Sequence, residues 1–265
     1  MSRLSAVFER LKAQKRAGLI TYVTAGDPDL PRSARVLEAL ARAGADVIEV
    51  GVPFSDPIAD GPAIQRASER ALAAGGGLGA TLDLVAGGRA NGRPPIVLFT
   101  YVNPVLKMGL DTFARRAADA GVDGVLLLDL PIEEASAARG VLDGHGLDLI
   151  FLVSPTTTDA RLAEAARLGR GFLYAISRLG VTGARDRVAA SAGPLVARVR
   201  AATGLPVALG FGISTRAHVV EVSRFADAAV VGSALVQVIG DTAAAGGDVP
   251  VRVEAFVRGL KGGPS

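Results

Sequence analysis

The stretch Asp46-Val-Ile-Glu-Val-Gly-Val-Pro-Phe-Ser-Asp-Pro-Ile-Ala-Asp-Gly-Pro62 joins a predicted strand to a predicted helix. Its opening residues are mostly apolar and β-branched, which is typical of a buried strand. Pro62 suits the first turn of a helix, where its missing N–H is not needed. One carboxylate, Glu49, therefore lies at the end of a strand, and a second, Asp60, lies at the end of a proline-stiffened loop. Two carboxylates in different surroundings can divide acid and base work between them.

The same pattern of strand followed by helix recurs along most of the chain. Short apolar runs, several of them preceded by Gly or Pro, predict further strands. The eight predicted strands are Leu19–Thr24, Asp46–Val50, Pro95–Tyr101, Gly124–Leu128, Leu147–Val153, Gly171–Ile176, Leu205–Leu209 and Asp227–Val231. Because these runs are almost continuously apolar, they suit strands that are buried on both faces of a parallel sheet.

Helical patterns lie between the strands, and most of them stop at a glycine. The predicted helices are Ser33–Ala43, Asp111–Ala120, Glu133–Leu142, Ala160–Leu168 and Gly193–Ala202, with Met1–Gln14 as a further helix before the first strand. Eight such units in about 250 residues describe a (β/α)8 TIM barrel with an extra N-terminal helix. We expect residues 1–265 to form a single domain. A doubly wound open sheet is the alternative, but no Gly-x-Gly-x-x-Gly turn follows the first strand.

Composition limits the possible classes of function. The chain has 265 residues, a net charge of +3, a pI of about 9.6 and no cysteine. Its arginines are scattered, which argues against a nucleic-acid surface. No apolar run reaches the roughly 20 residues that a membrane span needs, and the N-terminus lacks the apolar centre of a signal peptide. We therefore expect a cytoplasmic protein that binds neither nucleic acid nor membrane.

The ends of the strands are where a barrel of this class carries its function. Side chains alternate along a strand, so Glu49 shares a face with Val47. If that face is the barrel interior, burial raises the pKa of Glu49 toward the range that a proton-transfer group needs. The alternative is a glutamate paired with an arginine at the barrel rim. For Asp60 the alternatives are a helix N-cap and a turn residue, and neither excludes catalysis.

Two glycine-containing strand ends indicate an anion site. Gly210-Phe-Gly-Ile-Ser214 and Gly232-Ser233 each follow a predicted strand and precede a helix. Small residues let backbone N–H groups approach an anion, and helix N-termini favour negative charge. Loops after the seventh and eighth strands often hold a phosphate in such barrels. Two ordinary turns capped by Ser214 and Ser233 are the alternative. The loop Ser177–Gly183 is either a lid over the substrate or a plain surface loop.

Several other chemistries lack the residues that they need. His145 follows a predicted helix and His218 lies within one, so neither is at a strand end and no metal site is expected. A metal-dependent epimerase or isomerase is thereby disfavoured. No predicted strand ends in lysine, which argues against Schiff-base chemistry. Without cysteine, thiol acid–base chemistry is excluded.

At this point the motifs resemble one known family. The resembling segments are Phe8, Ile20–Pro28, Glu49–Pro62, Tyr101–Pro104, Asp129–Pro131, Ser154–Pro155, Ser177–Gly183 and Gly210–Ile213. They follow one another in order through nearly the whole chain, and Glu49–Pro62 is the most specific of them. The sequence resembles the α subunits of tryptophan synthase.

The resemblance implies a carbon–carbon lyase of L-tryptophan biosynthesis, which cleaves indole-3-glycerol phosphate to indole and glyceraldehyde 3-phosphate in a retro-aldol step. Glu49 matches the family's general acid and base, and Asp60 matches the carboxylate that stabilises positive charge on the indole nitrogen. The matching substrate-binding positions are Tyr22, Phe99, Tyr101 and Leu126 at the indole pocket, Tyr174 near the substrate, Thr182 and Gly183 in the lid, and Phe211, Gly212, Gly232 and Ser233 at the phosphate. Tyr22 stands where the family often has phenylalanine, and Phe99 where it has a smaller aliphatic residue.

The resemblance also implies a partner. This is a β subunit that carries pyridoxal phosphate, in an α2β2 complex through which indole passes along a tunnel, while no cofactor or metal is expected in this chain. Pro53–Asp60 and a loop over Asn103–Gly109 would meet the partner. The alternative function is a catalytically silent phosphate-binding barrel that only activates a partner. The presence of both Glu49 and Asp60 argues against that alternative.

Overall fold

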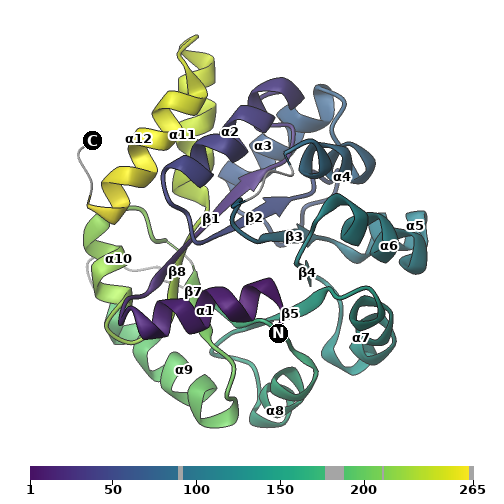
Figure 1. Ribbon diagram of the computed structural model, residues 1–265, viewed down its shortest axis with the longest axis vertical. Coiled ribbons are helices and arrows are strands. Elements are labelled where there is room, and N and C mark those ends of the chain that lie inside the picture. The colour runs from purple at the N-terminus through teal and green to yellow at the C-terminus, as the bar shows by residue number, and fades with distance from the viewer. Residues whose placement is uncertain (89–91, 177–187, 211, 263–265) are drawn as a thin grey trace.

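Eight parallel strands close into a barrel, in which consecutive strands pair and β8 returns to β1. The computed structural model describes residues 1–88, 92–176, 188–210 and 212–262. The expected (β/α)8 barrel with an additional N-terminal helix is confirmed, and Figure 1 shows the helices arranged around the sheet. The doubly wound alternative is wrong because the sheet is closed.

The strands coincide with the eight predicted apolar runs, with bounds that differ by at most two residues. They are β1 (Gly18–Thr24), β2 (Val47–Gly51), β3 (Ile96–Thr100), β4 (Gly124–Leu127), β5 (Asp148–Val153), β6 (Leu173–Ile176), β7 (Val207–Gly210) and β8 (Ala228–Val231). Glu49 lies in the middle of β2 and not at its end, because the strand continues to Gly51, which pairs with Phe99.

The helices follow the strands in alternation. They are α1 (Arg3–Ala13), α2 (Leu30–Arg42), α3 (Pro62–Ala73), α4 (Leu78–Gly87), α5 (Val102–Met108), α6 (Leu110–Ala120), α7 (Ala135–Gly144), α8 (Asp159–Leu168), α9 (Val188–Ala202), α10 (Arg216–Val222), α11 (Ser233–Ala244) and α12 (Val249–Lys261), with the 3-10 turn η1 (Ile132–Glu134) before α7. All the predicted helices are present. Helix α9 begins earlier than the predicted Gly193, because Pro194 lies inside the helix and does not start it. None of the helices in the described ranges is long and apolar enough to cross a membrane.

The loop predicted over Asn103–Gly109 is wrong, because most of this segment belongs to helix α5. The side chain of Asp129, which follows β4, accepts a hydrogen bond of 2.7 Å from the backbone N–H of Val102 at the start of the helix. Pro104 falls in the first turn, where a missing N–H removes no helical hydrogen bond. The carboxylate that accepts the first N–H of α5 therefore follows another strand, β4, and is not part of the sequence around the helix.

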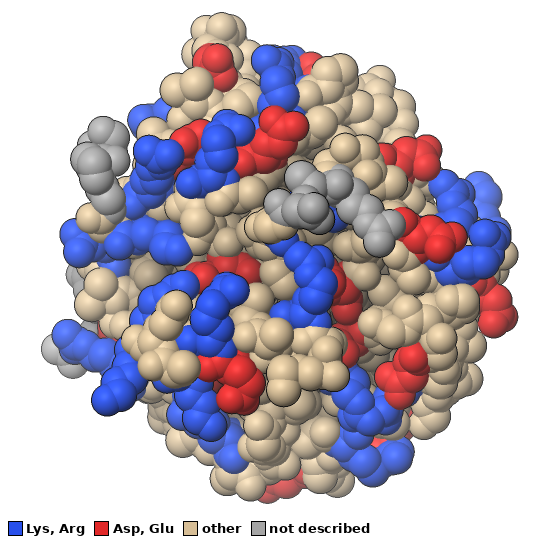
Figure 2. Space-filling view, viewed as in Figure 1, with Lys and Arg blue, Asp and Glu red and all other residues tan. Residues whose placement is uncertain are grey.

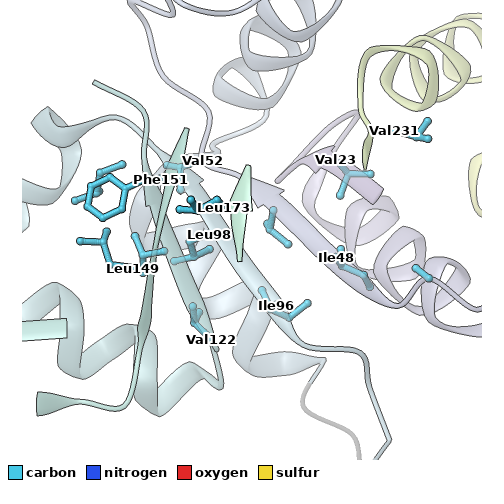
Figure 3. Close-up of a cluster of buried hydrophobic side chains, with 14 of the residues drawn as sticks. Val23, Ile48, Val52, Ile96, Leu98, Val122, Leu149, Phe151, Leu173 and Val231 are labelled. Carbon is cyan, nitrogen blue, oxygen red and sulfur yellow. The ribbon is translucent and has the colours of Figure 1, made fainter. Parts of the chain in front are cut away.

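Alternation of side chains along the strands produces two separate cores. Outward-facing residues such as Ile48 and Leu98 pack beneath the surrounding helices in the larger core, part of which is drawn in Figure 3. Inward-facing residues such as Val47 and Val97 fill the barrel itself. The barrel interior is therefore filled by side chains toward the N-terminal ends of the strands. A site that needs space has to lie toward their C-terminal ends.

Helix α1 closes the lower, N-terminal end of the barrel (Figure 1). Its buried residues Leu4 and Phe8 belong to the interior core, and the Phe8 ring lies 5.5 Å from that of Phe172 on the loop before β6. This contact seals the end of the barrel that faces away from the strand ends. A catalytic site in the barrel therefore has to lie at the opposite end, where the strands have their C-terminal ends.

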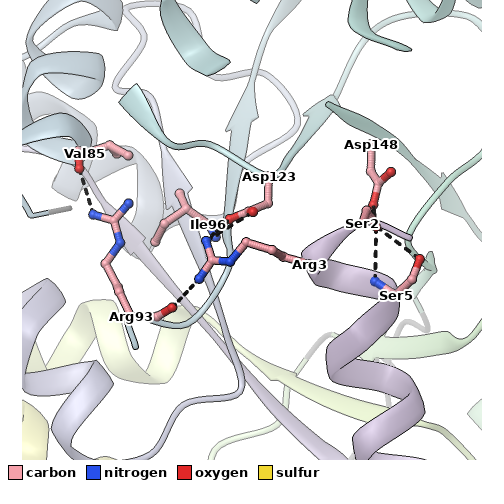
Figure 4. Close-up of polar contacts among 8 residues, drawn as sticks. All are labelled: Ser2, Arg3, Ser5, Val85, Arg93, Ile96, Asp123 and Asp148. Atoms are coloured by element: carbon pink, nitrogen blue, oxygen red, sulfur yellow. Dashed lines mark hydrogen bonds and ion pairs between the residues drawn. The ribbon is translucent and has the colours of Figure 1, made fainter. Parts of the chain in front are cut away.

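Polar contacts attach the start of α1 to the barrel, as Figure 4 shows. The guanidinium of Arg3 lies 3.0 Å from the carboxylate of Asp123, and the same carboxylate accepts a hydrogen bond of 2.8 Å from the backbone N–H of Ile96. The hydroxyl of Ser2 donates to the carboxylate of Asp148. The helix is therefore fixed to the beginnings of β3, β4 and β5, which keeps the lower end closed.

Candidate active site

Glu49 lies inside the barrel with no exposed surface. In the register of the sheet its neighbours are Tyr22 on β1 and Val97 on β3, and it shares the interior face with Val47. The predicted inward orientation is confirmed. The alternative of an ion pair at the rim is wrong, because no arginine of the described residues pairs with Glu49.

The carboxyl group of Glu49 is buried, and within the described ranges neither of its oxygens has a hydrogen-bond partner. Burial favours the neutral form of a carboxyl group, and here it raises the pKa of Glu49 to about 8. A group that titrates near neutrality can both give and take a proton. Unpaired buried polar groups are uncommon in folded proteins, so Glu49 is a candidate functional residue.

Asp60 lies in the loop between β2 and α3, and it is held by a tyrosine. The Tyr101 hydroxyl donates a hydrogen bond of 3.1 Å to its carboxylate. Burial raises the pKa of Asp60, and the hydrogen bond from Tyr101 opposes part of that rise. Gly61, and not Asp60, is the N-cap of α3, so the N-cap alternative is wrong. The side chain of Asp60 therefore contacts Tyr101 and does not cap the helix.

Aromatic rings line the same region of the barrel. Tyr22 and Phe99 meet edge to face with ring centres 5.3 Å apart. Tyr22 is buried in a small cluster with Ala67 and Val236, and Phe99 packs against both this cluster and the interior core. Phe99 pairs in register with Leu126, which is fully buried in that core. Four side chains are predicted for an indole pocket. Tyr22 comes from β1, Phe99 from β3 and Leu126 from β4, and Tyr101 directly follows β3. They form an apolar wall near Glu49 of the kind that suits a flat aromatic ligand.

Tyr22, which is buried, and Tyr174, which is half-buried, each lie against a glycine of the next strand. The hydroxyl of Tyr22 occupies the space that a Cβ at Gly51 would need, and Tyr174 does the same at Gly210. Burial, followed by the charge of Glu49, raises the pKa of Tyr174, and burial likewise raises that of Tyr22. Both phenols therefore stay neutral and can act only as hydrogen-bonding groups and apolar walls.

The glycine-containing loops after β7 and β8 have features that suit an anion. Gly212 has φ of +74°, a conformation that glycine adopts without strain. Gly232 is the N-cap of α11 and offers no side chain to the first turn, while Ser233 is its first residue and is exposed. Thr215 caps α10, so neither Ser214 nor Ser233 is the cap that the alternative requires. Free backbone N–H groups are thus left at the start of α11.

Three predicted site residues, Thr182, Gly183 and Phe211, lie outside the described residues, as does the predicted lid Ser177–Gly183. The structure adds one contact that the sequence did not indicate. His218 in α10 accepts a hydrogen bond of 3.3 Å at Nδ1 from the backbone N–H of Ser214, so it supports the loop that begins at Gly212. Only the helical spacing between these two residues could have suggested it.

Among the described residues, no cluster of three or more His, Cys, Asp or Glu side chains could hold a metal ion. His145 is the C-cap of α7, at the end of the helix remote from the strand ends, which agrees with its predicted absence from the site. The donors at the barrel mouth are instead one neutral buried acid, one loop carboxylate and backbone N–H groups. That set suits proton transfer and electrostatic stabilisation.

A closed (β/α)8 barrel with a buried carboxyl group and a second carboxylate at its mouth defines the class of barrel enzymes that work by acid–base chemistry. Residues 8–263 match the sequence profile described as tryptophan synthase alpha chain. The tryptophan synthase alpha chain of Solibacter usitatus is 49% identical over 263 residues, which are 99% of this chain and 98% of that one. The chain belongs to the tryptophan synthase alpha chain family.

Solved structures agree with this assignment. Tryptophan synthase subunit alpha from Legionella pneumophila superposes with a TM-score of 0.89 at 37% identity, covering 98% of this chain and 97% of that one. A chain of Mycobacterium tuberculosis tryptophan synthase gives a TM-score of 0.88 at 42% identity, covering 98% and 96%. Both similarities extend over the whole barrel.

Family membership gives the reaction. The chain is a carbon–carbon lyase of tryptophan biosynthesis that cleaves indole-3-glycerol phosphate to indole and glyceraldehyde 3-phosphate. It acts as an α subunit together with a β subunit, and the pyridoxal phosphate of the complex belongs to that β subunit. The alternative of a silent barrel is not favoured.

Proposed function

We propose that Glu49 is the proton-transfer group of this cleavage and that Asp60 stabilises the charge that develops on the indole ring. One observation carries the proposal: the carboxyl group of Glu49 is wholly buried and unpartnered within the described residues, and its pKa is raised to about 8. A surface glutamate would be ionised at neutral pH and could not donate a proton. This glutamate is partly protonated there.

The chemistry needs two proton transfers. The ring carbon that bears the side chain gains a proton, and the hydroxyl on the adjacent side-chain carbon loses one. The bond between these two carbons then breaks, its electrons return to the ring, and the hydroxyl carbon becomes the aldehyde of glyceraldehyde 3-phosphate. Glu49 can give the first proton in its neutral form and accept the second in its ionised form, which returns it to its starting state.

Protonation of the ring carbon leaves a positive charge on the indole nitrogen. Asp60 is the second carboxylate at the barrel mouth, and the hydrogen bond from Tyr101 fixes its direction. An anion that is already oriented where charge develops lowers the barrier without reorganisation during the reaction. The hydrogen bond also favours the ionised form of Asp60, which is the form that this role requires.

We assign substrate contacts to two regions. The indole ring lies against Tyr22, Phe99, Tyr101 and Leu126, with Tyr174 on a neighbouring wall, because these side chains supply the apolar lining described above. The phosphate lies at Gly212, whose φ of +74° needs no side chain, and at Gly232 and Ser233, where α11 begins without a side-chain cap among the described residues. Thr182, Gly183 and Phe211 stay assigned by family resemblance.

Exposed apolar side chains support a partner contact beside the site. Ile58, in the loop that contains Asp60, is 86% exposed, and Leu106 in α5 is 64% exposed. Large apolar side chains at such exposure mark interaction surfaces when they occur together. We propose that Pro53–Asp60 and α5 contact the β subunit, so that binding of the partner and the position of Asp60 are linked. We further propose that the chain is a single domain and acts in the cytoplasm.

The experiment is an indole-release assay with indole-3-glycerol phosphate and the β subunit present. Glu49→Gln keeps the size of the side chain and removes its proton transfer, so we expect turnover to fall by at least a thousandfold while substrate binding is retained. Asp60→Asn is expected to lower kcat more than it raises KM. A Glu49→Gln variant with near-normal turnover would remove Glu49 from the role proposed for it.

A further inference from the structure

A groove of about 560 Å³ lies at the closed end of the barrel, away from Glu49. It is bordered by the C-terminal half of α1, by residues 203–206 before β7 and by residues 223–227 before β8. Figure 1 shows these segments together, where α1 ends beside α9 and α10. The volume falls within the range of small-molecule sites, which is about 300–1,000 Å³. The established reaction makes no use of this end of the barrel.

The lining of the groove is strongly basic. Its charged side chains are the cations Lys12, Lys15, Arg16, Arg200 and Arg224 and the anions Glu9 and Asp227. Five cations against two anions leave an excess of three positive charges, which equals the net charge of +3 of the entire chain. Figure 2 shows more Lys and Arg side chains on the left half of this face than on the right, with Asp and Glu side chains among them. The groove therefore has a local excess of positive charge.

The cations of the groove fall into two groups. Arg16 is fixed by hydrogen bonds of 2.7 and 2.9 Å to Asp46, and Arg200 lies 2.8 Å from Asp227. Lys12, Lys15 and Arg224 are exposed and have no ion-pair partner in the part of the chain that the structure describes.

Lys15 also has an unusual backbone. Its φ is +52°, and every other described residue with positive φ is a glycine. The conformation belongs to the turn that ends α1, in which the backbone N–H of Lys15 donates to the carbonyl of Lys12 (3.0 Å) and that of Arg16 to the carbonyl of Leu11 (3.2 Å). The residue at this position of such a turn is usually glycine. Lys15 follows the helix and lines the groove.

We propose that this groove is a second ligand site, which binds a small, multiply charged phosphate compound through Lys12, Lys15 and Arg224. Phosphate oxygens accept charge-assisted hydrogen bonds from ammonium and guanidinium groups, and three flexible cations can surround one such anion. The positive charge borders a single groove and does not continue as a stripe, so the ligand is small and is not a nucleic acid. A bound anion would join α1 to the loops before β7 and β8 and would stabilise the closed end of the barrel.

The test is a calorimetric titration of the full-length chain with inorganic pyrophosphate at constant ionic strength. Saturating glyceraldehyde 3-phosphate is present, so that the catalytic mouth is already occupied. We expect one pyrophosphate per chain, and Lys15→Gly with Arg224→Ala should weaken it about tenfold or more. Lys15→Gly should not lower the thermal stability of the ligand-free protein, because glycine removes the backbone strain. Lyase activity should stay unchanged in this variant.

The matched control is Arg115→Ala with Arg116→Ala, which removes two positive charges from α6 on the other side of the molecule. We expect it to leave pyrophosphate affinity unchanged. Citrate provides the second arm, because it carries similar charge on carboxylates and should bind more weakly than pyrophosphate. The proposal is overturned if pyrophosphate does not bind, if the control variant weakens it equally, or if citrate binds more tightly.

Discussion

Tyr101 and Asp60 form a hydrogen bond that joins the end of β3 to the loop after β2, with 3.1 Å between the Tyr101 hydroxyl and Oδ2 of Asp60. The same hydroxyl accepts a hydrogen bond of 3.1 Å from the backbone N–H of Ala59. One phenol therefore holds both the side chain and the backbone of this loop. Because Asp129 caps the helix that begins directly after Tyr101, the arrangement is supported from β4 as well. The loop carboxylate thus depends on two strands that do not contain it.

Tyr101→Phe should weaken catalysis and alter its pH dependence. The hydrogen bond from Tyr101 lowers the pKa of Asp60 against the effect of burial, so its removal raises that pKa further. Since the role proposed for Asp60 needs its ionised form, the acidic limb of the pH profile of kcat/KM should move to higher pH. We expect kcat/KM at neutral pH to fall by roughly tenfold to a hundredfold. Tyr22→Phe, which removes a hydroxyl that does not bond to Asp60, should leave the acidic limb in place. An unmoved limb in Tyr101→Phe would show that the hydrogen bond does not control Asp60.

Glu49→Gln should make the protein more stable at high pH while abolishing activity. The pKa of Glu49 is raised from 4.5 to about 8, so the folded state keeps a proton that the unfolded state releases above 4.5. The stability that comes from the neutral carboxyl is complete below that value and is lost as pH rises through about 8. The amide of the variant does not ionise. Urea unfolding at pH 5, 7 and 9 should therefore show a difference that grows with pH in favour of the variant, since each unit of pKa corresponds to about 1.4 kcal/mol. Parallel stability curves would contradict the raised pKa.

Much of this site follows from local sequence rules. The inward direction of Glu49 follows from alternation along β2, which puts it on the same face as Val47, and the order of strands and helices predicts the barrel that this face lines. The sequence does not show which side chains of one strand, helix or loop contact another. Asp129 starts α5 from a different strand, so no pattern within Asn103–Gly109 indicates a helix there.

The same limit applies to the charges at the closed end of the barrel. Arg224 is far from Lys12 and Lys15 in the sequence, and composition alone describes these cations as scattered. Only the return of β8 to β1 brings the end of α1 next to the loop before β8. Local periodicity determines which way a side chain points, whereas barrel closure determines which side chains meet.

Gly51→Ala should damage the site through Tyr22, whose ring and hydroxyl fill the space that the new methyl group needs. The tyrosine must move, and it lies beside Glu49 in the register. We expect a loss of about 2–3 kcal/mol in stability, in the upper part of the range for overpacking of a core, together with lower turnover. Gly140→Ala in α7 meets no neighbouring atoms and should be neutral or stabilising by up to about 1 kcal/mol.

A double-mutant cycle separates this contact from a general effect on β2. With Tyr22→Ala already present, the methyl group of Gly51→Ala has room, so its additional cost in the unfolding free energy should fall below about 0.5 kcal/mol. Urea unfolding of the four proteins measures the coupling. Additive effects of the two substitutions would mean that Gly51 is required for another reason.

Asp46→Asn should destabilise the barrel at neutral pH but not in acid. The Asp46 carboxylate accepts a hydrogen bond of 2.9 Å from the backbone N–H of Leu19 and binds the guanidinium of Arg16. Burial alone would raise the pKa of Asp46, but the hydrogen bonds from Arg16 and Leu19 outweigh it and hold that pKa below its usual value.

The stability that the ionised Asp46 contributes is present above the usual pKa of an aspartate and is lost as pH falls through the lower folded value. We expect Asp46→Asn to cost about 1.5–3 kcal/mol at pH 7, because the buried carboxylate and its charge-assisted hydrogen bonds from Arg16 and Leu19 are lost, and the difference from the original protein to shrink toward pH 3. Asp119→Asn, at an exposed ion pair on α6, should cost less than about 1 kcal/mol at either pH. A cost for Asp46→Asn that does not change between pH 7 and pH 3 would mean that packing of the side chain, and not its charge, secures the first two strands.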